Sequence, residues 1–311
     1  MRPLILQLFS PMPAIQERLD ARYRTQKFAA GEVDPDWLRE NAVDVRGVVT
    51  AGDIGVSNDL ANQLPNLGVI AINGVGHDRV DLDYARARNI HVTITPDVLT
   101  DDVADVAIGL MLNCYRKLAA ADAYLRRGEW LRKSYPLTRK ASGRRYGIVG
   151  LGRIGQAIAT RLQGFGGTIA YANRTARPVA YQYYPDVTAL AAASDVLFVT
   201  IAANTATKGL ISAAVLSSLG PDGIIVNVAR GSVIDEDALL AALAEGRIAG
   251  AGLDVFVDEP NVPAGLLRLD NVALTPHVGS GTVETRMAMG NLLIDNLDAF
   301  FSGKALPSAV V

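Results

Sequence analysis

The chain has 311 residues, of which 50% are hydrophobic and 20% are charged, with a formal net charge of −2. This length is sufficient for two domains with hydrophobic cores, and the near-neutral balance argues against a nucleic-acid or membrane partner. The single cysteine, Cys114, is expected to be a core residue. No signal peptide or membrane-spanning stretch is evident, so we expect a cytoplasmic protein.

The first third of the chain alternates short apolar runs with helical stretches. Strands are expected at residues 4–9, 47–50, 67–72 and 90–93, and helices at residues 14–23, 37–41 and 81–88. Strands that alternate with helices predict a parallel sheet covered on both faces. A complete small α/β unit is therefore expected before residue 100.

One long helix is predicted over residues 101–128, because apolar residues recur there with helical spacing. Further strands are expected at residues 168–171, 196–200, 223–228 and 250–253, and a last helix at residues 283–301. The pattern predicts a second α/β unit. The fold class is thus α/β, with two Rossmann-like, doubly wound parallel-sheet domains and a cleft between them.

Three glycines, Gly150, Gly152 and Gly155, follow an apolar run near the middle of the chain and precede a helical stretch. This spacing is typical of the tight turn in a dinucleotide-binding βαβ unit. The first glycine permits the turn, the second allows a pyrophosphate to approach, and the third allows the helix to lie against the strand. The helix N-terminus then faces the phosphates. The predicted cofactor contacts also include the intervening Leu151, Arg153 and Ile154.

An NAD site usually has an acidic residue about twenty positions after the glycines, which binds the adenosine ribose. Here no Asp or Glu occurs between Glu129 and Asp186, and the corresponding place holds Asn173, Arg174 and Thr175. An arginine can pair with a 2′-phosphate that a carboxylate would repel. The sequence therefore favours NADP(H), with NAD(H) as the alternative.

The glycine pattern lies far into the chain, which indicates an inserted nucleotide domain. We predict a discontinuous substrate domain, residues 1–98 plus 283–311, and an inserted dinucleotide-binding domain, residues 99–282. The chain would cross between them near Pro96 and near Gly281, which would give two hinges. Two domains in series remain the alternative.

Three later stretches place polar residues after apolar strands, where open α/β sheets bind ligands. They contribute Arg230, Glu259 and His277. This set suits the reduction of a 2-keto acid: arginine would hold the carboxylate and polarise the keto oxygen, and histidine would donate the proton. Glutamate beside histidine would favour the imidazolium. Spacing alone does not bring the three together.

In these contexts, Asn-Val-Ala-Arg-Gly, Asp-Glu-Pro and Pro-His-Val-Gly, the chain resembles the D-2-hydroxyacid dehydrogenase family over essentially its whole length. The resemblance implies a split two-domain architecture, a homodimer formed through the nucleotide domain, and catalytic roles for Arg230, Glu259 and His277. It also implies that Asp254 binds the nicotinamide carboxamide and that residues 73–76 bind the substrate carboxylate. The substrate-binding set is Asn73, Gly74, Val75, Gly76 and Arg230, and Ala229 joins the cofactor contacts.

Within that family, Asn173-Arg174-Thr175 is similar to the NADPH-dependent glyoxylate/hydroxypyruvate reductase branch. The expected reaction is reduction of glyoxylate, hydroxypyruvate or a longer relative such as 2-ketogluconate to the D-2-hydroxy acid. The rival interpretations are a regulatory module that binds a nucleotide without turnover, and another dinucleotide enzyme such as an alanine dehydrogenase.

Four other residues are weaker candidates for contact with substrate. His77 is expected to have no catalytic role, with contact to substrate as the alternative, and His91 is expected to be structural. Arg286 could face the cleft or be solvated. Trp130 is expected to be a packing residue, with contact to a partner subunit's substrate as the alternative. No cluster of metal-ligating residues has a suitable spacing, so no metal is predicted.

Overall fold

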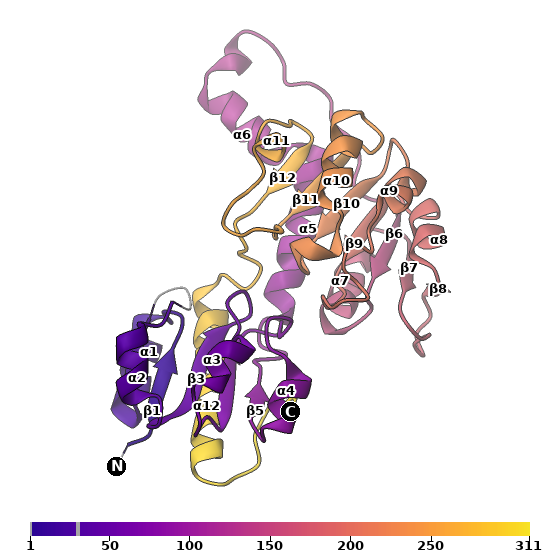
Figure 1. Cartoon of the computed structure of the whole chain (residues 1–311). Coiled ribbons are helices and arrows are strands. Elements are labelled where there is room, and N and C mark those ends of the chain that lie inside the picture. Colours follow the sequence, from indigo (N-terminus) through magenta and orange to yellow (C-terminus); the bar gives the residue numbers. More distant parts are fainter. Residues whose placement is uncertain (1, 29–31) are drawn as a thin grey trace. The chain divides into compact units, whose positions relative to one another are not determined.

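The computed structural model describes residues 2–28 and 32–311. The chain forms two compact units, and we describe each by itself. Unit 1 comprises Met1–Leu99 and Thr282–Val311, and unit 2 comprises Thr100–Gly281. The indigo start and the yellow end of the chain therefore belong to the same unit (Figure 1). The predicted domain limits lie beside these boundaries.

Unit 1 contains a sheet of five parallel strands in the order β2-β1-β3-β4-β5. The central strands are apolar and buried on both faces, as expected of a parallel sheet between helices. The strands are β1 Leu4–Gln7, β2 Arg24–Lys27, β3 Val45–Ala51, β4 Val69–Asn73 and β5 His91–Thr93.

Helices pack on both faces of this sheet and bury two separate apolar clusters. Asp34, Ser57, Asp81 and Thr282 cap four of these helices, because each side chain accepts a hydrogen bond from a backbone N–H of the first turn. The helices are α1 Pro13–Arg22, α2 Pro35–Asn41, α3 Asn58–Asn62, α4 Leu82–Ala87 and α12 Val283–Phe301.

Unit 2 contains a sheet of seven parallel strands in the order β12-β11-β10-β9-β6-β7-β8. Strands β6, β7 and β8 follow one another toward one edge of the sheet, and β9 to β12 follow one another toward the other edge. The direction in which strands are added therefore reverses between β6 and β9. Open α/β sheets bind ligands at such a reversal. The strands are β6 Arg144–Val149, β7 Gly167–Ala172, β8 Gln182–Tyr184, β9 Val196–Val199, β10 Ile224–Asn227, β11 Gly250–Leu253 and β12 Val272–Leu274.

The helices of unit 2 pack by apolar stripes of helical period. In α7, for example, Gly155, Ile158, Ala159 and Leu162 are buried. The α-helices are α5 Thr100–Arg116, α6 Leu118–Arg126, α7 Arg153–Gln163, α8 Val187–Ala192, α9 Ala213–Leu219, α10 Glu236–Ala244 and α11 Ala264–Leu267. Two 3₁₀ turns, η2 Glu129–Leu131 and η3 Gly231–Val233, complete the unit.

The structure confirms the predicted fold class of two parallel-sheet α/β domains. The prediction of one helix over residues 101–128 is wrong, because the chain breaks at Lys117, whose φ of 51° is left-handed. Lysine is a good helix former, so propensity gave no sign of this break. Strands β2 and β8 were not predicted because they are short, polar and partly exposed.

β5 lies at one edge of the sheet of unit 1, and the end of the chain covers this edge. Thr93 pairs with Ala309 in an antiparallel bridge, and the backbone of Ser308 is held by the side chain of Asn296 in α12. The amide of Asn296 also donates to the Ser308 hydroxyl at 2.8 Å, and the residue is fully buried. A covered edge offers no free backbone groups to a second sheet.

Replacing Asn296 by Ala removes both hydrogen bonds to Ser308 and leaves buried polar groups without partners. We expect the free energy of unfolding to fall by about 1–3 kcal/mol, measured by chemical denaturation. Asp295→Ala is the matched control, since Asp295 is an exposed neighbour on the same helix. Its effect is expected to stay within about 0.5 kcal/mol. Equal effects of the two substitutions would contradict the role of Asn296.

Candidate active site

Three neighbouring strands of unit 2 end at the predicted catalytic residues. β10, β11 and β12 are adjacent and parallel, so their carboxyl ends share one edge of the sheet. Arg230 follows β10, Glu259 follows β11, and His277 follows β12. Parallel pairing therefore brings together side chains that are up to 47 residues apart in the sequence (277 − 230).

Glu259 and His277 form a close pair. Nδ1 of His277 lies 2.7 Å from Oε2 of Glu259. The side chain of His277 is 35% exposed and that of Glu259 is 22% exposed. The other oxygen of the carboxylate, Oε1, accepts a hydrogen bond from the backbone N–H of Phe256 at 2.9 Å. Both oxygens of Glu259 are thus held, and the imidazole keeps Nε2 for a further hydrogen bond.

The pair shifts both pKa values toward the charged forms. The hydrogen bond to Glu259 raises the pKa of His277 above its ordinary value, although burial and the charge of Arg230 oppose the rise. Burial alone would raise the pKa of Glu259, but the bonds from His277 and Phe256 and the nearby positive charges hold that pKa below its usual range. The electrostatic influence of Arg230 on both groups places the three residues in one cluster.

Asp254 holds the turn on which His277 lies. One oxygen accepts from the Thr275 hydroxyl at 2.7 Å and from the N–H of Val278 at 2.8 Å, and the other accepts from the N–H of Gly279 at 2.8 Å. Asp254 is only 2% exposed, so three donors compensate the cost of burying it. The predicted contact of Asp254 with the nicotinamide stays a prediction.

The strained backbone of His277 explains why this turn needs support. Its φ of 50° lies in the left-handed region that a residue with a side chain rarely adopts. The N–H of His277 also donates to the backbone oxygen of Asp254 at 2.9 Å. Such strain persists only where surrounding contacts fix the conformation.

The turn that carries Arg230 is fixed by Asn227, the last residue of β10. The Asn227 amide donates to the backbone oxygen of Arg230 at 2.9 Å and accepts from the N–H of Ala229 at 3.0 Å. The residue is 1% exposed. Sequence reasoning gave Asn227 no role, although a polar residue that ends an otherwise apolar strand was a usable signal.

Gly231 brings this turn against the loop that carries Glu259. A Cβ atom at Gly231 would lie 2.0 Å from the carbonyl carbon of Phe256 and 2.3 Å from the nitrogen of Val257. No side chain can be accommodated there. The two backbone segments that present Arg230 and Glu259 are therefore in direct contact.

The glycine turn after β6 fits a dinucleotide pyrophosphate. Gly150 has a φ of 98°, and a Cβ there would lie 2.8 Å from the backbone of Ile201; one at Gly155 would lie 2.3 Å from the oxygen of Gly150. At Gly152, which precedes the first residue of α7, a Cβ would meet no atom within 4 Å. The fold itself thus needs glycine at the first and third positions, whereas the second position leaves space beside a helix N-terminus.

Asn173 follows β7 and joins the glycine turn. Its side-chain oxygen accepts a hydrogen bond from the N–H of Leu151 at 2.8 Å. Arg174 and Thr175, which come next, are exposed. The structure therefore places a fixed amide and an exposed guanidinium where an NAD-binding site would have a carboxylate.

The remaining predicted substrate contacts lie in unit 1. Asn73 ends β4, and Gly74, Val75 and Gly76 follow it as a partly exposed loop. The backbone oxygen of Gly74 accepts from the N–H of Thr95 at 2.8 Å, which fixes the start of this loop. The ring of His77 turns back to the same loop, with Nδ1 3.2 Å from the oxygen of Val75.

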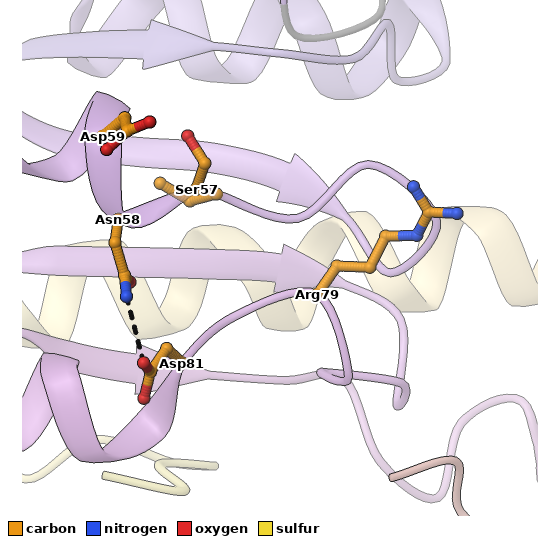
Figure 2. A pocket seen from close by; sticks show the side chains of 6 residues that line it. Ser57, Asn58, Asp59, Arg79 and Asp81 are labelled. Atoms are coloured by element: carbon orange, nitrogen blue, oxygen red, sulfur yellow. Dashed lines mark hydrogen bonds between the residues drawn. The ribbon is translucent and has the colours of Figure 1, made fainter. Parts of the chain in front are cut away.

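A separate surface pocket of unit 1 is formed where α3 and α4 begin (Figure 2). Asn58 donates to Asp81 at 3.0 Å across it, and Ser57 and Asp81 also cap the two helices. Arg79 lines the same pocket. The serine and aspartate thus serve helix capping, and we assign the pocket no ligand.

Cys114 is buried, as predicted. The prediction that Trp130 packs in the chain is wrong, since it is 65% exposed.

Within residues 2–28 and 32–311, no three His, Cys, Asp or Glu side chains are grouped so as to hold a metal ion. Nor does any helix of that described part have the length and apolar character needed to cross a membrane.

Comparison with known proteins identifies related enzymes. Residues 108–279 match the family model described as "D-isomer specific 2-hydroxyacid dehydrogenase, NAD binding domain". Two relatives align over nearly the full length of both chains. They are the 2-ketogluconate reductase of Gluconobacter oxydans (45% identical; 100% of this chain, 99% of the relative) and a glyoxylate/hydroxypyruvate reductase A of Arabidopsis thaliana (44%; 98% and 98%).

A solved structure is also similar throughout. It is the NADPH-dependent glyoxylate/hydroxypyruvate reductase of Sinorhizobium meliloti in complex with NADP and malonate. It superposes with a TM-score of 0.93 at 45% identity, and the match covers 100% of this chain and 97% of that chain.

The chain therefore belongs to the D-isomer-specific 2-hydroxyacid dehydrogenase family. It is an NAD(P)-dependent enzyme that interconverts 2-keto acids and 2-hydroxy acids. The family resemblance and the class of enzyme predicted from the sequence are both confirmed.

The space at Gly152 gives a direct test of the dinucleotide site. Gly152→Ala should leave the melting temperature unchanged, because the new methyl group meets no protein atom within 4 Å. Dinucleotide affinity should fall roughly tenfold or more, since a misfitting methyl group typically costs about 1–3 kcal/mol. Both quantities can be measured by thermal melts and titration calorimetry.

Gly109→Ala in α5 is the matched control, because a Cβ there also meets open space. It should raise stability by up to about 1 kcal/mol, as alanine is the better helix former, and leave dinucleotide affinity unchanged. Undiminished affinity in the Gly152→Ala variant would show that the pyrophosphate does not approach this turn.

Proposed function

We propose that the chain is an NADPH-dependent reductase of a small 2-keto acid, with His277 as proton donor and a D-2-hydroxy acid as product. The candidate substrates are glyoxylate, hydroxypyruvate and a longer relative such as 2-ketogluconate. The observation that carries the proposal is the 2.7 Å distance between Nδ1 of His277 and Oε2 of Glu259, in a pair on which the positive charge of Arg230 also acts.

In this proposal the protein supplies a positive charge that binds the substrate carboxylate and a proton for the keto oxygen. Arg230 binds the substrate carboxylate and polarises the keto oxygen. His277, protonated because Glu259 raises its pKa, donates a proton from Nε2 to that oxygen, since Nδ1 is engaged by Glu259. When bound, the reduced dinucleotide supplies the hydride for the keto carbon. The imidazole is left neutral beside an ionised Glu259 and takes a new proton from solvent.

The preference for NADPH is supported by the residues after β7. Arg174 is exposed beside Asn173, whose oxygen is already bonded to the glycine turn. A guanidinium at this place favours a 2′-phosphate. The similar Sinorhizobium meliloti enzyme is named NADPH-dependent and was solved with NADP.

Two further features complete the proposal. The backbone N–H groups of the loop of residues 73–76 are assigned to the substrate carboxylate on the family resemblance alone. A homodimer is assigned on the same ground, and the apolar side chains of Trp130, Leu131 and Leu137 are exposed and available to a second copy.

A panel of 2-keto acids assayed with NADPH and with NADH tests the whole proposal. At least one of glyoxylate, hydroxypyruvate and 2-ketogluconate should be reduced, with a higher kcat/KM for NADPH. His277→Ala should lower kcat roughly 10²–10⁴-fold, the usual contribution of a general acid, and leave dinucleotide affinity intact. Failure of every substrate, or equal rates with NADH, would overturn the corresponding part of the proposal.

The pH dependence of reduction should report the Glu259–His277 pair. Reduction requires the imidazolium, so kcat/KM should be constant below the raised pKa of His277 and fall as the pH rises through it. Glu259→Gln removes the partner that raises this pKa, and the decline should therefore begin at a lower pH. The profiles of both proteins would be compared in the same buffers.

Glu236→Gln serves as the control, because Glu236 contacts the neighbouring backbone N–H of Val257 and not His277. Its pH profile should match that of the original protein. An unshifted profile in the Glu259→Gln variant would remove Glu259 from the control of proton donation.

A further inference from the structure

Tyrosine hydroxyls form hydrogen bonds with the backbone at both ends of the loop of residues 173–177, which carries Arg174. At its start, the hydroxyl of Tyr183 donates to the backbone oxygen of Asn173 at 3.2 Å. At its end, the hydroxyl of Tyr171 accepts from the N–H of Arg177 at 2.7 Å and donates to the oxygen of Arg177 at 3.2 Å. Between these points Arg174 and Thr175 are exposed.

The two tyrosines are cross-strand partners. Tyr171 in β7 pairs in register with Tyr183 in the edge strand β8, and their rings lie 5.4 Å apart at 44°. Tyr171 is only 1% exposed and is anchored in the core of unit 2, whereas Tyr183 is half-buried. Each ring thus fixes the position of the other, and their hydroxyls hold the loop against the sheet.

A third connection joins the loop to the glycine turn. The side chain of Asn173 accepts from the N–H of Leu151, so one residue contacts both the phosphate-binding turn and, through its backbone, Tyr183. The backbone that carries Arg174 is therefore fixed relative to the place where the pyrophosphate fits.

We propose that Tyr171 and Tyr183 are positioning residues that set the preference for a 2′-phosphorylated dinucleotide by holding the backbone on both sides of Arg174. The inference rests on the proposed NADPH preference and deepens it. An exposed arginine on an unsupported loop would lose conformational entropy when it paired with a phosphate. A loop already held in place avoids much of that loss, which raises affinity for the phosphate without a new contact.

Binding of 2′,5′-ADP and of 5′-AMP to the substrate-free protein isolates this effect, because the two probes differ only in the 2′-phosphate. We would measure both affinities by titration calorimetry for Tyr183→Phe and Tyr171→Phe. Affinity for 2′,5′-ADP should fall roughly fivefold when one hydrogen bond is lost and more when two are lost, as expected from the net value of such bonds. Affinity for 5′-AMP should change less than twofold.

Tyr181→Phe is the matched control. Tyr181 lies two positions before Tyr183, but its hydroxyl accepts from the Gln163 amide at 2.9 Å and not from the loop. This variant should bind both probes as the original protein does. A loss of 2′,5′-ADP affinity equal to that of Tyr183→Phe would overturn the inference.

Combination with Arg174→Ala separates positioning from a general structural effect. If the tyrosines act through Arg174, then Tyr183→Phe should cause no further loss of 2′,5′-ADP affinity in the Arg174→Ala background. An additive loss, or an equal loss for both probes, would overturn the inference. Thermal melts verify that each variant is folded, and Tyr183→Phe gives the decisive result if the buried Tyr171→Phe variant does not fold.

The inference and the proposed cofactor preference fail in different ways. If the original protein binds both probes equally, the NADPH preference is wrong and the inference falls with it. If the original protein discriminates and both tyrosine variants discriminate equally well, only the inference is wrong.

Discussion

The buried carboxylate of Asp254 holds the turn of His277 through three hydrogen bonds, and the arrangement of the candidate active site depends on that turn. The left-handed conformation of His277 would be unfavourable without this support. With it, the ring meets Glu259, whose own carboxylate is fixed by the N–H of Phe256. Two carboxylates thus favour a protonated imidazole, while burial and Arg230 oppose it. A partly buried imidazolium requires this kind of compensation.

In unit 2, the segments predicted to bind the cofactor and the predicted catalytic residues lie at different places along one edge of the sheet. The glycine turn follows β6, next to the reversal of strand order, and the cluster of Arg230, Glu259 and His277 follows β10 to β12 on one side of it. The loop with Arg174 follows β7 on the other side. Because all seven strands are parallel, every one of these segments emerges at the same edge of the sheet.

Apolar periodicity and glycine spacing were sufficient to predict the fold class, and β11 and α12 have the predicted bounds. These signals arise from burial, which the sequence records directly. The break at Lys117 and the polar strands β2 and β8 depend on tertiary pairing, so no local pattern revealed them. For the site, residue types indicated the reaction, but only the paired strands bring Glu259 to His277. The roles of Asn227 and Asp254 in holding turns need the fold, since each acts on backbone groups.

The position of β8 has a consequence for how cofactor preference can be altered. As an edge strand it pairs with β7 on one side, and Tyr183 and its neighbours are partly exposed, so substitutions there disturb little of the core. The turns of Arg230 and Glu259, by contrast, touch directly at Gly231, where no Cβ can be accommodated. Under the proposed role of Arg174, changes beside it would adjust the choice between NADPH and NADH at small cost in stability. Changes to the cluster of Arg230, Glu259 and His277 must keep these two touching turns intact, so the fold constrains this cluster more tightly than the loop of Arg174.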